Sequence, residues 1–210
     1  MLKDGPTSRN ISRSLEFRAA TADFALRKGP FGARELAAAA LHEVTSEHQS
    51  AIGLLLKFER FASAQAMIRP CVESALRTVW LLRCTTEVDV EKLQTRPRDW
   101  PNLEDLIGRI EGVHRMGGSI RKLLPPRTLL NDLTHGGFSQ IADKIHPAYA
   151  KVNASVISNE RWREVVAKFC IKHADRMLCL SSVVMHIDLG DPAKADLVSE
   201  IYKQTVSTYE

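Results

Sequence analysis

The stretch "SAQAMIRPCVESALRTVWLL" (residues 63–82) indicates a helical fold, because its apolar residues recur at the spacing of an α-helix. The apolar stripe consists of Ile68, Val72, Leu76 and Val79. Pro70 lies inside the pattern and has no main-chain N–H to donate, so we expect either a kink or a helix that starts near Arg69. A helix this apolar belongs in the core of a helical protein.

Three charged side chains lie beside this apolar stripe. Arg69, Glu73 and Arg77 follow one another at intervals of four residues, so they share one side of the helix. A charge at the edge of a buried face is tolerated only when it is paired and hydrogen-bonded. Two interpretations stay open: the Arg69–Glu73 pair either ties two helices together or orients a third group supplied from elsewhere in the chain.

The segment "RTLLNDLTHGG" (residues 127–137) supplies the candidate for that third group. Arg127, Asn131 and His135 recur every four residues, so they share one face of a helix. The two glycines after His135 are predicted to end or interrupt this helix, where the helix dipole favours an imidazolium. Two interpretations of His135 stay open. It is either a general acid or base beside Glu73, or a histidine at the end of a helix that hydrogen-bonds the last main-chain carbonyls of that helix or the Glu73 carboxylate.

A further histidine, His48 of "LHEVTSEHQS", lies on a long Ala-rich helix predicted from residue 33 to about residue 60. We expect His48 to pack near the charged pair of the core helix and to join its cluster. His42 and Glu43 are expected on the solvent side. The predicted buried side of this helix consists of Leu36, Leu41, Val44, Ile52, Leu55 and Leu56. The candidate catalytic residues are thus Arg69, Glu73, Asn131 and His135, with Arg127 and His48 as secondary candidates.

Helix signals recur along the rest of the chain, and strand signals are nearly absent. An N-terminal apolar stripe from Ile11 to Leu26 stops at the breaker segment "KGPFG". Thr86, Asn102 and Asp191 are predicted N-caps of later helices, and "HRMGGSIRKLLPP" is expected to be irregular. These signals predict an all-α fold, a helical bundle of about seven or eight helices.

The predicted organisation is a single all-α domain over residues 1–210. It comprises an N-terminal helix and linker (1–32), a core bundle (33–187) and a C-terminal helix (191–207). The long helices at 33–60, 63–83 and 158–187 are expected to form the core. No repeat of fixed period appears, which argues against a solenoid.

Composition narrows the functional classes. The chain has 210 residues, 44% of them hydrophobic and 26% charged, which are ordinary values for a globular protein. A net charge of +4 is too small to indicate by itself a nucleic-acid-binding surface. The chain has no run of about eighteen uncharged apolar residues and no apolar leader, so we expect no membrane association. Four cysteines without a CxxC pair suit a reducing, cytoplasmic location.

No cofactor and no metal site is predicted. The segment "EGVH" (residues 111–114) has the Glu-x-x-His spacing of di-iron bundles, but such sites require a second copy, which the sequence lacks. A Gly-rich phosphate loop, a GxSxG motif and an HExxH motif are also absent from the sequence. Basic residues in the middle of the chain either attract RNA phosphates or form a solvated surface; they are Arg96, Arg98, Arg109, Arg115, Arg121 and Lys122.

The segment "IRPCVESALRTVWLLRCTTEVDVEKL" (residues 68–93), followed about 40 residues later by "LNDLTHGGFSQI", resembles bacterial helical families of unknown function. The likeness covers roughly residues 40–142. More distantly, the pattern is similar to the HEPN superfamily of helical bundles. Its catalytic members are metal-independent ribonucleases of toxin–antitoxin and phage-defence systems, in which an Arg and a His a few residues apart on one helix meet their counterparts across a dimer.

The resemblance implies a HEPN-like homodimer whose partner is RNA or an antitoxin-like protein. Seven residues separate Arg127 from His135, which departs from the spacing of the catalytic motif. Our first hypothesis is therefore a regulatory or interaction module with an Arg/Glu/His polar cluster. The alternative is a metal-independent ribonuclease. There His135 would be the acid or base, Arg69 or Arg127 would stabilise the phosphorane charge, and Glu73 and Asn131 would orient them.

Overall fold

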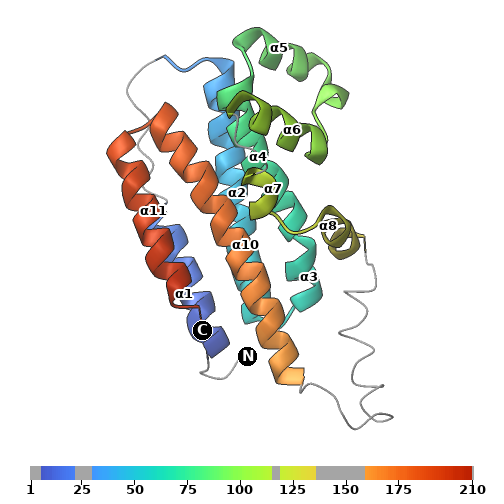
Figure 1. Cartoon of the computed structure of the whole chain (residues 1–210), viewed down its shortest axis with the longest axis vertical. Helices are drawn as coiled ribbons and strands as arrows, with labels where there is room; N and C mark the ends of the chain where they lie inside the picture. Colours follow the sequence, from blue (N-terminus) through green and yellow to red (C-terminus); the bar gives the residue numbers. More distant parts are fainter. Residues whose placement is uncertain (1–5, 22–29, 115–118, 136–158, 210) are drawn as a thin grey trace.

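The computed structural model describes residues 6–21, 30–114, 119–135 and 159–209, and all regular structure within these ranges is helical. The all-α prediction is confirmed. The helices are α1 (Pro6–Thr21), α2 (Ala33–Lys57), α3 (Phe61–Ala66), α4 (Ile68–Cys84), α5 (Glu87–Thr95), the 3-10 helix η1 (Pro97–Asp99), α6 (Leu103–His114), α7 (Ser119–Leu123), α8 (Arg127–Thr134), α10 (Asn159–Asp188) and α11 (Pro192–Ser207) (Figure 1). Among them, no helix has both the length and the apolar character that crossing a membrane requires. Leu26, Arg115, Gly136 and Gly137 lie outside the described residues.

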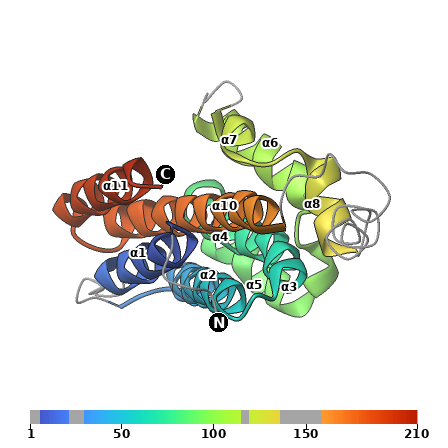
Figure 2. The same ribbon diagram turned by 90° about the horizontal axis from the view of Figure 1, so that it is seen from below.

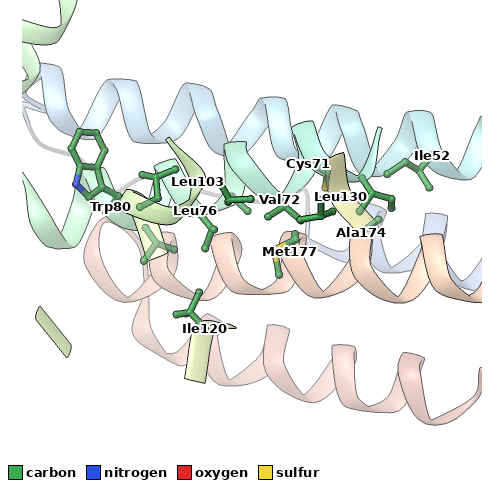
Figure 3. Packing of buried hydrophobic residues seen from close by; sticks show 14 of the residues in the cluster. Ile52, Cys71, Val72, Leu76, Trp80, Leu103, Ile120, Leu130, Ala174 and Met177 are labelled. Atoms are coloured by element: carbon green, nitrogen blue, oxygen red, sulfur yellow. The ribbon is translucent and has the colours of Figure 1, made fainter. Parts of the chain in front are cut away.

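Helices α2, α4 and α10 pack against one another and form the centre of the bundle, as predicted (Figures 1 and 2). The main hydrophobic cluster draws residues from all three. In Figure 3, Val72 and Leu76 of α4 lie with Ala174 and Met177 of α10 inside this cluster. Helices α1 and α11 cover the outer side of α10, whereas α5 and α6 lie at the far end of α4 (Figure 1). The apolar stripe of the opening stretch therefore faces the core.

The predicted single helix is divided into α3 and α4 at Met67, which is the C-cap of α3 and the N-cap of α4. Helix α4 begins at Ile68, so Pro70 lies in its first turn. A proline is tolerated there because the first main-chain N–H groups of a helix have no partner within the helix. Of the two possibilities raised by Pro70, the helix start is the one observed, and it brings Arg69 to the first turn of α4.

The register of α2 differs from the prediction. Leu36 was expected in the core, but 55% of its surface is exposed. His42 was expected in solvent, but it is buried and its Nδ1 lies 3.0 Å from Ser181 Oγ of α10. Both predictions are wrong for one reason: this face of α2 packs against polar residues of α1 and α10, so it buries polar side chains such as Gln49.

A buried carboxyl group joins four parts of the bundle. Asp175 of α10 has no exposed surface and accepts hydrogen bonds at Oδ1 from Ser14 Oγ of α1 (2.6 Å) and Gln49 Nε2 of α2 (2.8 Å). Its Oδ2 accepts a hydrogen bond from the hydroxyl of Tyr209, just beyond α11. Burial raises the pKa of Asp175, and these three donors lower it partway back. The network thereby fixes α1, α2 and the end of the chain on α10.

The predicted caps are largely confirmed. Thr86 Oγ1 accepts the main-chain N–H of Asp89 at the start of α5, and Asp191 caps α11 with Pro192 at its first position. Asn102 Oδ1 accepts the N–H of Asp105 at the start of α6. Part of the segment expected to be irregular instead forms the short helix α7. These caps define where α5, α6 and α11 begin.

Candidate functional site

Two helices that lie far apart in the sequence bring a polar cluster together. Arg69 in the first turn of α4 donates from Nη1 to Asn131 Oδ1 of α8 at 2.7 Å. The same Nη1 lies 3.5 Å from Nε2 of His135, the residue that ends α8. His135 is exposed. Helix α8 therefore presents its last two turns to the start of α4.

Glu73 lies between two arginines on α4. Its Oε1 accepts from Arg69 Nε at 2.8 Å, and its Oε2 accepts from Arg77 Nη2 at 3.1 Å. The exposed side-chain fractions are 27% for each arginine and 19% for Glu73. The four primary candidates, Arg69, Glu73, Asn131 and His135, thus form one connected cluster that solvent reaches. Their catalytic role stays a prediction.

Arg77 is held from its other side by aromatic rings. Its guanidinium carbon lies 5.6 Å from the centroid of Trp100, within the range of a cation–π contact. The ring centroids of Trp100 and Trp80 lie 6.0 Å apart. The guanidinium carbon of Arg109 lies 5.9 Å from the centroid of the Trp80 ring. The segment before α6 therefore positions Arg77, and through Glu73 it also supports Arg69.

Three members of the cluster, Arg69, Glu73 and His135, line an open cavity of about 410 Å³. Its walls come from α2, α4 and the end of α8 and consist of Leu41, Val44, His48, Arg69, Pro70, Glu73, Ser74, Arg77, Thr134 and His135. Charged and polar groups form one part of this wall, and Leu41, Val44 and Pro70 form an apolar part. A volume of this size suits a small ligand.

His48, a secondary candidate, lines the same cavity from α2. Partial burial lowers the pKa of its imidazole, and the neighbouring Glu47 raises it partway back. The environment of His48 therefore favours its neutral form. A neutral imidazole accepts a proton, so His48 brings a potential base to the cavity that contains Arg69.

Arg127, the other secondary candidate, lies apart from the cluster. It is exposed at the first position of α8 and lines a different cavity, between α6 and α8. The spacing prediction placed Arg127 on one helix face with Asn131 and His135. That face is interrupted, because α8 is only eight residues long and His135 already has a non-helical backbone with φ −102° and ψ 19°.

The cysteine nearest the site, Cys71, is a buried thiol. All four cysteines are free, and Cys71, Cys170 and Cys179 are buried. Burial raises the pKa of the Cys71 thiol, although Arg69 is only two positions away in the sequence. Burial also raises the pKa of Cys179 to about 12. Within the ranges that the structure describes, no three His, Cys, Asp or Glu side chains gather as a metal site would require.

Sequence reasoning missed Trp100 and did not count Arg77 among the site residues. Arg77 carried a signal, since it shares the helix side of Arg69 and Glu73. Trp100 carried none, because it comes from an irregular segment whose position against α4 depends on how α6 packs. Ser74 and Thr134 also line the cavity and were not singled out.

Comparison with known proteins places the chain in a family. No curated protein and no solved structure matches it. The family model described as "Family of unknown function (DUF6988)" matches residues 42–208. This span runs from the middle of α2 to beyond α11, so it includes every residue that lines the Arg69 cavity except Leu41. The chain belongs to the DUF6988 family.

Proposed function

We propose that the protein is a regulatory or interaction module of a HEPN-like type that binds an anionic group of its ligand in the Arg69 cavity. The observation that carries the proposal is the accessibility of the cluster. A purely structural network would be sealed from water, whereas Arg69 and Arg77 each keep 27% of their side-chain surface exposed on a cavity wall. An exposed, positioned guanidinium is suited to receive a ligand.

The charge balance of the cavity favours an anion. Two guanidinium groups, Arg69 and Arg77, share the single carboxylate of Glu73. The cavity wall therefore carries a net positive charge even with both of its histidines neutral. Guanidinium groups bind phosphate and carboxylate through paired, charge-assisted hydrogen bonds.

The cluster is also organised before a ligand arrives. Arg69 is fixed at two atoms, Nε by Glu73 and Nη1 by Asn131. A side chain held in this way loses little conformational entropy when it binds a ligand, so more of the contact energy appears as affinity. Glu73 and Asn131 are thus positioning residues in this proposal.

Calorimetric titration of the full chain with inorganic phosphate tests the proposal. We expect saturable binding by the wild type, binding roughly tenfold weaker for Arg69→Gln, and unchanged binding for Arg98→Gln. Arg98 is a matched control because it is exposed on η1 and does not line the cavity. Equal binding by wild type and Arg69→Gln, or no binding by either, would contradict the proposal.

A second candidate function is a metal-independent ribonuclease of a toxin–antitoxin or phage-defence system. The observation that favours it is that His48 and His135 line the same cavity as Arg69. Cleavage of RNA by attack of its 2′-hydroxyl needs a base for that hydroxyl, an acid for the leaving oxygen and a cation for the phosphorane. His48, neutral through partial burial, suits the base, and His135 the acid.

RNA degradation in the presence of EDTA tests this second function. The expected result is cleavage by the wild type, loss of cleavage in His135→Ala and in His48→Ala, and full cleavage by Arg98→Gln. Circular dichroism confirms that each variant is folded. Absence of cleavage by the wild type, or undiminished cleavage by His135→Ala, rules out the nuclease while leaving the anion-binding proposal intact.

The HEPN resemblance extends the proposal to assembly and location. We propose a cytoplasmic homodimer, with RNA or an antitoxin-like protein as the partner. In such a dimer the exposed His135 of one chain would lie near the Arg69 cavity of the second copy. Light scattering during size-exclusion chromatography should give twice the 23.5 kDa mass of one chain. A mass of one chain at all concentrations would count against the dimer.

A further inference from the structure

A second cavity lies on the other side of α8 and has no part in the proposed function. It measures about 280 Å³ and lies between α6, the segment that joins α7 to α8, and α8 itself. Its apolar wall includes Leu103, Ile107, Leu124 and Leu130. Leu103, Ile107 and Leu130 are buried members of the main hydrophobic cluster, so the floor of this cavity is fixed by the core.

The charged residues of this cavity are unevenly paired. Arg121 Nη1 contacts Glu104 Oε2 at 2.8 Å, so these two charges neutralise each other. Arg127 is exposed, and within the described ranges no acidic side chain pairs with it. An apolar cavity with one unpaired guanidinium is complementary to a molecule that has an apolar body and one negative charge.

We propose that this cavity binds a small carboxylate with an apolar body, with the carboxylate on Arg127 and the body against Ile107, Leu124 and Leu130. Arg127 provides the planar pair of N–H donors that a carboxylate accepts. The volume lies just below the lower limit of about 300 Å³ for typical small-molecule sites, which favours a ligand of few atoms.

The helix that borders this cavity also carries the Arg69 cluster. Arg127 and Leu130 line the second cavity, whereas Thr134 and the following His135 line the first. The two cavities are therefore separate and contain no common residue. The proposal for the second cavity therefore does not rest on the proposed function, and each cavity can be tested by itself.

Nuclear magnetic resonance titration of the full ¹⁵N-labelled chain tests the proposal, with hexanoate, hexan-1-ol and acetate as probes. We expect saturable shifts of the main-chain amide signals of Leu124 and of residues 127–130 with hexanoate; Pro125 and Pro126 have no N–H. Hexan-1-ol lacks the charge and acetate lacks the apolar body, so each should bind roughly tenfold more weakly or not at all. Arg127→Gln should weaken hexanoate binding by about the same factor, and Arg98→Gln should leave it unchanged.

Leu124→Trp gives a second, independent variant, since a larger side chain on the cavity wall occupies the volume without altering a charge. It should abolish the hexanoate shifts while the remaining amide signals show a folded chain. Absence of saturable shifts at the amides of Leu124 and residues 127–130 of the wild type would overturn the proposal. So would equal hexanoate affinity in wild type and Arg127→Gln, or equal affinity for hexanoate and hexan-1-ol.

Discussion

Arg69 of α4 donates a hydrogen bond of 2.7 Å to Asn131 of α8, although 62 positions separate the two residues in the sequence. This bond joins the first turn of a core helix to a short peripheral helix. Helix α8 has eight residues, which is too short for a helix to be stable on its own. Its position therefore depends on contacts such as this one and on the burial of Leu130 and Leu133.

Replacing Asn131 by Leu should loosen α8. The change removes the acceptor of Arg69 Nη1 and should lower the free energy of unfolding by about 1–2 kcal/mol, as expected for a partly buried hydrogen bond to a charged group. Urea denaturation measures the loss. Asn131→Asp keeps the acceptor oxygen and is the control, which should retain the stability of the wild type. Equal destabilisation by both variants would show that the bond does not hold α8.

Replacing Glu73 by Gln should strengthen phosphate binding while weakening the fold. The change removes the one carboxylate between Arg69 and Arg77. Removal of a negative charge near the ligand is worth about 1 kcal/mol at the solvent-exposed limit, which corresponds to roughly fivefold higher affinity. Titration calorimetry with inorganic phosphate measures the change in affinity. Glu43→Gln, on the exposed side of α2, should leave the affinity unchanged. Glutamine keeps a side-chain oxygen that can hold Arg69, so an unchanged or lower affinity in Glu73→Gln would contradict the charge balance proposed for the cavity.

His42 should make the fold less stable in acid. Burial, together with the smaller effect of the nearby His186, lowers its pKa from 6.5 to about 4. As the pH falls below 6.5, the unfolded chain takes up a proton at His42 before the folded chain does, so stability is lost down to about pH 4 and is constant below that value. The free energy of unfolding lost through His42 over this pH range is at most about 3 kcal/mol.

The pH dependence is measured as the difference between wild type and His42→Gln in urea denaturation between pH 4 and 6.5. His173 has the same depressed pKa, about 4, and remains in both proteins, so its contribution cancels. Glutamine keeps a hydrogen-bonding group for Ser181 but does not titrate. The variant should lose less stability over this range. Identical slopes for the two proteins would show that His42 is not kept neutral by burial.

Tyr209→Phe should destabilise the fold although Tyr209 lies at the end of the chain. The change removes one of three hydrogen-bond donors to the buried Asp175 and should cost about 1–3 kcal/mol, because a buried carboxyl group is left with an unpaired oxygen. Tyr202→Phe is the matched control, since the Tyr202 hydroxyl accepts only a long bond of 3.4 Å from Arg176. Thermal denaturation should show the larger effect at Tyr209, and similar effects at both positions would argue against the network.

The parts of the fold that the sequence predicted depend on local signals. Pro70 restricts where α4 can start, and Asp191 followed by Pro192 defines the first turn of α11. The cluster of Arg69 with His135 was also anticipated. A charge in an apolar helix needs a partner, and "RTLLNDLTHGG" was the strongest candidate to supply it.

The buried face of α2 could not be predicted in the same way. A helix face with His42, Thr45 and Gln49 looks solvated until the neighbouring helices are known. Here α1 and α10 supply Ser14 and Asp175, which accept hydrogen bonds from Gln49 Nε2, so the polar face becomes part of the interior. Hydrophobic periodicity identifies buried faces only where the neighbours are apolar.

The most direct test of the account is the nuclear magnetic resonance signal of the Arg69 Nε–H group during titration with inorganic phosphate. Occupation of the cavity should produce a saturable shift of this signal and of the His135 ring, with no saturable change at the Nε–H of Arg98. Arg69 and His135 signals that do not respond to phosphate at any concentration, while the chain remains folded, would contradict an anion site at the junction of α4 and α8.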